Sequence, residues 1–159
     1  MKIDHIVLTG YRRFRLRQIH KFDYHPAKKT QVILGSNGSG KSSLMEELSP
    51  LPINTKDYEI GGGKEVWVRH QGKQYYLSCL VTEEGNRFHF EVDGVNLNQG
   101  YNITGYRTLV KEHFNYTKEI HQVLTGKISF HAMSVNDRRN WFLSLSDVNY
   151  EYAIKYFKR

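Results

Sequence analysis

The first third of the chain alternates short apolar runs with polar turns, a pattern typical of β-strands. Ile3–Leu8 is rich in β-branched residues and predicts a first strand, and Gln18–Tyr24 predicts a second. Thr30–Leu34 is a short apolar run that leads into a glycine-rich loop, so we expect a third strand there. Lys41–Leu48 has helical spacing and ends before two prolines, which cannot continue a helix.

The middle of the chain predicts antiparallel strands. A loop over Thr55–Gly63 is followed by three strand-like segments, Glu65–His70, Gln74–Val81 and Arg87–Val92. The dipeptide at positions 93–94 is Asp-Gly, which is typical of a tight hairpin turn. We therefore expect an antiparallel β-layer in this part of the chain.

The last third predicts helices. Apolar residues recur at helical spacing between Tyr106 and Phe114. Ser134 and Asp137 have the spacing of a capping box, with aspartate in the usual glutamate position, and precede a second helical pattern. The segment Tyr150–Phe157 is rich in aromatic residues and has no stop signal. We expect these aromatic side chains to pack against further protein, in a helix that continues beyond Arg159.

Composition limits the class of protein. A chain of 159 residues with 39% hydrophobic and 25% charged residues is globular and long enough for one domain with its own core. The single cysteine, Cys79, lies in a strand-like run and is expected in the core, and the absence of any disulfide fits the cytoplasm of a bacterium or a phage-infected host. There is no signal-peptide pattern and no apolar run long enough to span a membrane.

The basic excess suggests a polyanionic partner. The net charge of +7 comes from 23 basic and 16 acidic residues. After the first predicted strand, basic residues interleave with two aromatic residues, which suits contacts with phosphates and stacking on bases. A solvated basic surface is the alternative for this stretch. The eight histidines show no zinc-binding spacing, so no zinc site is predicted.

The strongest motif in the sequence is a complete P-loop. Gly35–Ser42 reads GSNGSGKS and matches G-x-x-x-x-G-K-[ST] at every fixed position. Glycines let the backbone curl so that N–H groups face the phosphates, Lys41 carries an ammonium to the β- and γ-phosphates, and the Ser42 hydroxyl is a ligand for Mg²⁺. The motif predicts binding of a nucleoside triphosphate, taken as ATP, with Mg²⁺.

The rest of a hydrolytic site is not evident. The magnesium of a P-loop ATPase is held by an acidic residue that follows an apolar strand. The nearest candidate is Glu83-Glu84 after Leu80-Val81, but the glycine that follows indicates a hairpin turn. No residue is therefore assigned a catalytic role.

The order of these motifs resembles a known family. A strand, then Tyr11-Arg12-Arg13-Phe14, then a strand that enters the P-loop, is similar to the N-terminal lobe of an SMC-type ATPase head, most closely that of SbcC and its Rad and phage relatives. Leu124–Ile128, followed by Arg139 in a helix, resembles a later stretch of that family. The resemblance implies a P-loop lobe of α/β class with α+β character, in which a mixed core sheet, an antiparallel β-layer and C-terminal helices occupy residues 1–159.

The resemblance also implies functional residues. The residues expected to contact nucleotide are Arg12, Asn37, Gly38, Ser39, Gly40, Lys41, Ser42 and Ser43, with a surface or DNA-facing role as the alternative for Arg12. Magnesium is assigned to Ser42 and to Gln122, because Thr125 stands where the family has a magnesium-associated glutamine. Arg13, Arg15 and Arg17 are the expected contacts with double-stranded DNA.

The resemblance implies that this chain holds only part of a catalytic site. In such proteins a coiled coil and a C-terminal lobe follow, and that lobe carries the remaining catalytic motifs. We therefore expect an ATPase for DNA repair or recombination. Its partners would be the C-terminal lobe, a second head that sandwiches ATP, an Mre-type nuclease subunit and DNA. The alternatives are a small self-contained P-loop NTPase or kinase, and a nucleotide-binding module without turnover.

Overall fold

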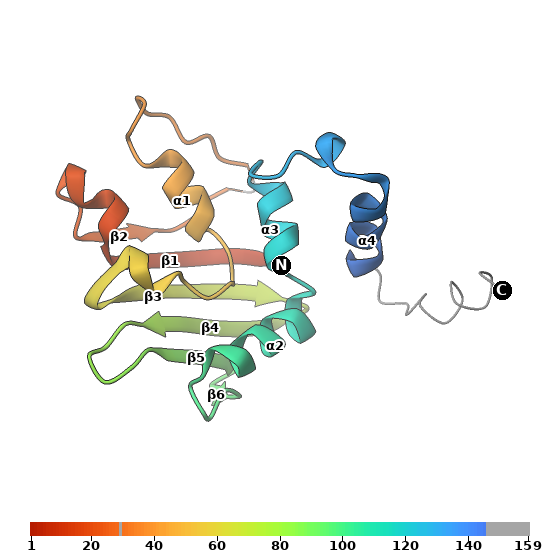
Figure 1. Ribbon diagram of the computed structural model, residues 1–159. Coiled ribbons are helices and arrows are strands. Elements are labelled where there is room, and N and C mark those ends of the chain that lie inside the picture. The colour runs from red at the N-terminus through yellow and green to blue at the C-terminus, as the bar shows by residue number, and fades with distance from the viewer. Residues whose placement is uncertain (29, 146–159) are drawn as a thin grey trace. The chain divides into compact units, whose positions relative to one another are not determined.

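The fold was examined in a computed structural model that describes residues 1–28 and 30–145. These residues divide into two compact units, with the boundary between Tyr116 and Thr117. The first unit holds a twisted sheet with two α-helices, and the second holds two short α-helices (Figure 1). Each unit is described by itself. The predicted aromatic segment Tyr150–Phe157 lies outside the described residues.

Six strands of the first unit form one sheet in the order β2-β1-β3-β4-β5-β6. All pairings among the described strands are antiparallel. The strands are β1 (Lys2–Tyr11), β2 (Lys21–Tyr24), β3 (Tyr58–His70), β4 (Lys73–Leu80), β5 (Arg87–Val92) and β6 (Val95–Asn96). The expected antiparallel layer is thus confirmed, whereas the expected mixed core sheet is not found in the described part of the chain.

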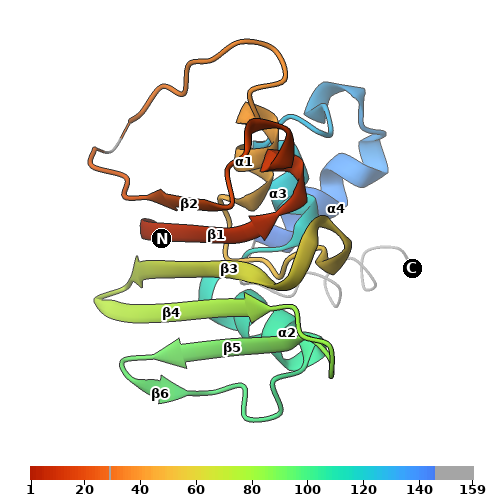
Figure 2. The ribbon, with the colours of Figure 1, turned by 90° about the vertical axis from the view of Figure 1, so that its left-hand side faces the viewer.

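The helices of the first unit cover one face of this sheet. Helices α1 (Lys41–Glu47) and α2 (Ile103–Phe114) both contribute to the core, α1 above the β1 and β2 side and α2 above β4 and β5 (Figure 2). Two 3-10 helices, η1 (Arg12–Arg17) and η2 (Thr55–Asp57), connect the strands. The buried residues of this core alternate along the strands: Ile6, Leu8, Val66, Val68, Tyr75, Leu77, Cys79, Phe88 and Phe90. Cys79 is therefore a core residue, as predicted.

Several predicted turns and helix ends are confirmed. Asp93 and Gly94 both have positive φ angles, 48° and 86°, as a type I′ hairpin turn requires. Residues 81–86 connect β4 to β5 without strand structure, so the pair Glu83-Glu84 lies in a turn, as expected. The Ser134 hydroxyl accepts a hydrogen bond from the Asp137 backbone N–H at 3.1 Å and donates to the Asp137 carboxylate at 2.7 Å. The N-terminal end of α4 is thus capped, although the aspartate bonds the serine side chain and not its backbone.

Three boundary predictions were wrong. The strand expected at Thr30–Leu34 does not form, because residues 31–36 have no strand partner among the described residues. The second strand begins at Lys21 and not at Gln18, since Gln18 takes a left-handed conformation (φ 56°) that ends η1. The loop expected over Thr55–Gly63 is largely the start of β3. Its glycines allow this, because a Cβ atom at Gly62 would lie 2.6 Å from the Thr9 carbonyl oxygen of β1.

The second unit holds α3 (Lys118–Leu124), the 3-10 helix η3 (Phe130–Ala132) and α4 (Val135–Leu145). Helix α3 begins at Thr117, whose side chain accepts a hydrogen bond from the Ile120 N–H, a standard cap for an otherwise unpaired donor. Phe130 packs edge-on against the rings of Trp141 and Phe142 in α4, at centroid distances of 5.2 and 5.4 Å. The helix predicted after Ser134 is therefore present up to residue 145, whereas α3 was not predicted.

Candidate nucleotide site

The P-loop connects the end of a long loop to the first turn of α1. Residues 36–39 form a turn in which the Ser39 N–H donates to the Ser36 carbonyl oxygen at 3.2 Å. Gly38 and Gly40 both take positive φ angles, 75° and 91°, which glycine adopts at little cost. The chain then enters α1, where the Leu44 N–H donates to the Gly40 carbonyl oxygen at 2.8 Å. The motif thus curls directly into a helix, as its chemistry requires.

The Lys41 side chain turns back over this loop. Its Nζ donates to the carbonyl oxygens of Gly35 and Ser36 at 2.6 and 2.8 Å, and it lies 3.5 Å from Ser39 Oγ. An ammonium held at the opening of a loop by carbonyl oxygens can exchange these acceptors for phosphate oxygens, which bind it more strongly because they are charged. The Lys41 ammonium therefore lies where it could contact a phosphate bound in the P-loop.

The remaining motif residues differ in exposure. Asn37, Gly38 and Ser42 are exposed, whereas Ser39, Gly40 and Ser43 are half-buried. The exposed Ser42 hydroxyl suits the predicted magnesium role, while the Ser43 carbonyl oxygen lies 3.5 Å from the Tyr11 hydroxyl group. The residues expected to contact nucleotide thus run from the loop into the first turn of α1.

The basic stretch after β1 packs against the P-loop. Phe14 of η1 is buried, and its ring lies so near Gly40 that a Cβ atom there would come within 2.7 Å of it. The two segments, far apart in the sequence, are therefore neighbours. Arg12, on this same stretch, donates through Nε to the Tyr58 carbonyl oxygen at 2.9 Å. That bond attaches the guanidinium group of Arg12 to the first residue of β3.

The arginines predicted to bind DNA have different surroundings. Arg13 forms ion pairs with Glu46 of α1 at 2.9 Å and with Asp57 at 3.1 Å, and the hydrogen bond that it donates to Asp57 raises the pKa of Arg13. Arg15 and Arg17 are exposed in the same 3-10 helix. Arg13 therefore holds η1 against α1, although its side chain is still 40% exposed.

The acidic residues of α1 are engaged with cations. Glu46 accepts from Arg13, and Glu47 is buried with its Oε2 3.3 Å from Lys64 Nζ. Lys64 also donates to the carbonyl oxygens of Glu47 and Ser49, at 3.4 and 3.3 Å. These contacts give both carboxylates structural partners, so neither is offered as the magnesium-binding acid of an ATPase.

Gln122 lies in the second unit. It is half-buried on α3, and its carbonyl oxygen lies 3.4 Å from Thr125 Oγ1, which donates to the His121 carbonyl oxygen at 2.8 Å. Gly126 follows with a φ of 72°, which ends the helix. The magnesium role given to Gln122 stays a prediction.

The segment before the P-loop exposes its apolar side chains. Val32 is 79% exposed and Leu34 is 87% exposed, whereas Ile33 packs against the core. Alternation of this kind is the pattern of a half-buried strand. The sequence thus has the character of a strand where the described structure has no strand.

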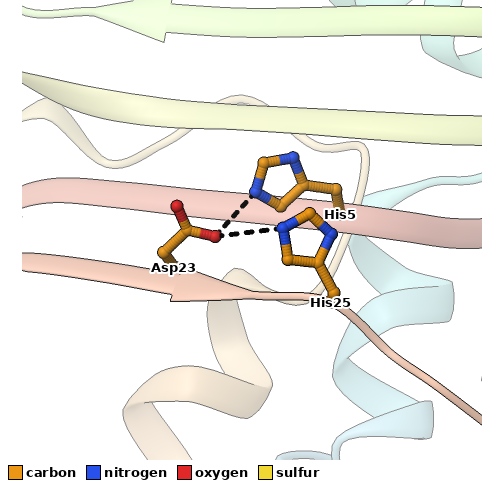
Figure 3. Close-up of side chains that lie close together, drawn as sticks. All are labelled: His5, Asp23 and His25. Atoms are coloured by element: carbon orange, nitrogen blue, oxygen red, sulfur yellow. Dashed lines mark hydrogen bonds and ion pairs between the residues drawn. The ribbon is translucent and has the colours of Figure 1, made fainter.

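Sequence reasoning missed one cluster outside the P-loop. His5 of β1, Asp23 of β2 and His25 place their ligand atoms within 4.8 Å of one another (Figure 3). The spacing rules that gave no zinc site considered neighbours along the chain, whereas this cluster is formed by pairing between strands. The signal that could have found it is the alternation Asp-x-His within the second strand, opposite a histidine in the first.

The sequence matches no protein-family model, and no curated protein is detectably similar to it. Within residues 1–28 and 30–145, none of the helices has the length and apolar character needed to cross a membrane. The functional argument therefore rests on the residues and their geometry.

Proposed function

We propose that this chain binds the phosphates of ATP, with Mg²⁺, through the P-loop Gly35–Ser42. The observation that carries this proposal is the position of the Lys41 ammonium, which donates to two carbonyl oxygens of its own loop. On binding, the lysine would release these oxygens for the β- and γ-phosphates, and the Ser42 hydroxyl would become a magnesium ligand. The loop backbone is already curled, so little ordering would be needed.

We further propose that the chain is the N-terminal half of an SMC- or SbcC-like ATPase head that acts in DNA repair or recombination. Support comes from the exposed apolar residues before the P-loop, Val32 and Leu34. Strands of a second lobe pairing with residues 30–34 would cover them and produce the mixed sheet that the sequence predicts. The same lobe would supply the acid that holds magnesium. A second head would close on ATP and regulate a partner nuclease on double-stranded DNA in the cytoplasm.

The small-kinase alternative has less support. Such an enzyme builds its site on a parallel sheet, whereas the described sheet is antiparallel throughout. A nucleotide-binding module without turnover would share the P-loop chemistry and differ only in what completes the site. Both alternatives also require Lys41 to contact the phosphates, so nucleotide binding is the first property to measure.

Isothermal calorimetry of ATP in the presence of Mg²⁺ tests the proposal. Lys41→Ala should reduce binding below detection, because it removes the charge that meets the phosphates. Lys73→Ala, an exposed lysine at the start of β4, is the matched control and should bind as the wild type does. Ser42→Ala should weaken binding chiefly when magnesium is present. Unchanged affinity in Lys41→Ala would disprove the phosphate-binding role of the loop.

A further inference from the structure

A cluster of three metal-ligating side chains lies on the sheet, on the face opposite the helices. His5 Nε2 is 2.8 Å from Asp23 Oδ1, and His25 Nε2 is 3.4 Å from the same oxygen (Figure 3). The side chains of His5, Asp23 and His25 are 21%, 48% and 68% exposed. A small ion could therefore reach the cluster from solvent without any change in the core.

The strand register explains why these residues meet. In the β1–β2 pair, Ile6 is opposite Tyr24 and Val7 is opposite Asp23. One more step of the same register places His5 opposite His25, and Asp23 lies two residues before His25 on the same face. The three side chains thus project from one face at the end of a paired segment, so the fold itself brings them together.

The rings are also held in position by stacking. His5 stacks on His25 with centroids 3.7 Å apart and planes within 12°, and on its other side it stacks on Trp67 at 4.3 Å. His5 is therefore fixed from both sides, and both imidazoles direct Nε2 toward the carboxylate. The hydrogen bond from His5 lowers the pKa of the Asp23 carboxyl group.

Two imidazole nitrogens and one carboxylate oxygen are a familiar ligand set for zinc and related transition metals. Zinc binds these atoms at about 2.0–2.2 Å, so tetrahedral ligands lie about 3.4 Å from one another. The observed separations of 2.8 and 3.4 Å are close to that value. The exposed His25 ring would in addition rotate out of its parallel stack on His5, so that both nitrogens face the ion. The ion would replace the proton that bridges His5 Nε2 and Asp23 Oδ1, and its fourth position would be open to water.

We propose that His5, Asp23 and His25 form a binding site for a divalent transition-metal ion of the zinc class. The site is separate from the P-loop in composition, because it uses nitrogen ligands where the Mg²⁺ site uses oxygen. It joins the edge strand β2 to β1, so the bound ion would also stabilise this edge of the sheet. The inference stands whether or not the chain binds ATP.

Cobalt(II) is the direct probe of this site. The tag-free full chain is first treated with a chelator and then titrated with Co²⁺, whose visible absorption is strong in a tetrahedral site with nitrogen ligands. We expect saturation at one ion per chain and loss of the band when Zn²⁺ is added. Zn²⁺ should also raise the thermal unfolding temperature in a concentration-dependent way, since it binds the folded state.

Variants assign the site. His25→Ala and Asp23→Asn change exposed side chains and should weaken Co²⁺ and Zn²⁺ binding by about tenfold or more, at least the loss that removal of an outer partner causes. His20→Ala, an exposed histidine just before β2, is the matched control and should bind as the wild type does. Lys41→Ala should also bind metal normally. The proposal is overturned if no tetrahedral cobalt band forms, or if His25→Ala and Asp23→Asn bind as tightly as the wild type.

Discussion

At position 40 both the backbone conformation and a neighbouring side chain favour glycine. The φ angle of 91° lies in the left-handed region, and the Phe14 ring occupies the space that a side chain would need. Gly38 has a similar φ of 75°, yet a Cβ atom there would meet nothing within 4 Å. A substitution at Gly38 therefore costs backbone strain alone, whereas a substitution at Gly40 costs backbone strain and a steric clash.

Gly40→Ala should destabilise the chain more than Gly38→Ala does. Each substitution places an L-residue in the left-handed region, which costs about 1–2 kcal/mol. Gly40→Ala must in addition displace the buried Phe14 ring, so its effect on the free energy of unfolding should be larger by about 1 kcal/mol or more. Urea denaturation measures both. Equal losses in the two variants would show that Phe14 does not pack on the loop.

At the scale of elements, a buried ion pair attaches α1 to the sheet. Glu47 near the end of the helix and Lys64 in β3 are each almost fully buried, with side-chain exposures of 8% and 2%. Lys64 also donates to the carbonyl oxygens of Glu47, the last residue of the helix, and of Ser49, two residues further on. This one lysine therefore binds the end of α1 and fixes the orientation of the helix that carries the P-loop.

Glu47→Ala should destabilise the fold by about 3–5 kcal/mol, because it leaves a buried ammonium without its carboxylate. The double variant Glu47→Leu/Lys64→Met should recover most of that loss, since two apolar groups need no partner. Chemical denaturation of the single and double variants gives the comparison. If the double variant is as unstable as Glu47→Ala, the apolar pair does not replace the ion pair and our account of this contact is wrong.

A second ion pair joins β1 to β3 at the surface. Both carboxylate oxygens of Asp4 accept from Arg69, at 2.5 and 2.8 Å, and this interaction lowers the pKa of Asp4 to about 2. The stabilisation is complete above the ordinary carboxyl pKa of 3.8 and is lost as the pH falls through about 2. Because Arg69 is largely exposed, solvent screening keeps the contribution of this ion pair to stability small.

Arg69→Ala should therefore be less stable than the wild type at pH 5 and nearly as stable at pH 2. Arg87→Ala, which removes a looser pair with Glu84 at 3.9 Å, is the control and should change little at either pH. Thermal unfolding followed by circular dichroism at both pH values measures the difference. A stability gap that stays constant down to pH 2 would contradict the role given to Asp4.

The elements that the sequence predicted well are those whose signals are local. Alternation over Arg87–Val92 gave the exact bounds of β5, and the Asp-Gly pair after it gave the turn. Helical spacing over Tyr106–Phe114 lies within α2. In each case the residues that decide the structure are neighbours along the chain, so propensity and periodicity suffice.

The elements that the sequence did not predict depend on partners elsewhere. Thr30–Leu34 has the composition of a strand, but a strand needs a neighbour for its hydrogen bonds, and composition does not say whether one is present. The glycines at the start of β3 predict a loop, whereas in the structure they permit close contact with β1 and β4. The His5, Asp23 and His25 cluster depends on strand register, which no spacing rule along one segment contains.

At the scale of the whole molecule, the net charge of +7 is the feature that favours DNA as a partner. Part of this charge lies in η1, near the P-loop. There Arg15 and Arg17 are exposed, and Arg13 is paired with Glu46 and Asp57. The structure therefore divides the three predicted DNA contacts into two available residues and one engaged residue.

If η1 contacts DNA, Arg15→Gln/Arg17→Gln should lower the slope of log affinity against log salt concentration by roughly 2, one unit for each lost phosphate contact. Arg13→Gln should change the slope less, since its guanidinium group already has carboxylate partners. Fluorescence anisotropy with a short DNA duplex over a range of salt concentrations measures these slopes. An unchanged slope in the double variant would assign η1 to solvent or to the nucleotide.

Nucleotide binding and nucleotide hydrolysis need different parts of the molecule. Binding through backbone N–H groups and Lys41 needs only residues near the loop, whereas hydrolysis needs an acid for magnesium and a group that orients water. The carboxylates of α1 are bound to Arg13 and Lys64, and Glu83-Glu84 lies in a turn. We therefore expect residues 1–159 to bind ATP without turning it over, and we expect turnover when a C-terminal lobe is added.

Equilibrium dialysis with magnesium and ATP labelled in the γ-phosphate tests this account most directly. Bound label and released phosphate are read from the same samples of the wild type and Lys41→Ala. The account predicts intact ATP bound to the wild type, none bound to Lys41→Ala, and phosphate release no faster than in buffer. Absence of binding to the wild type, or steady phosphate release that Lys41→Ala abolishes, would contradict it.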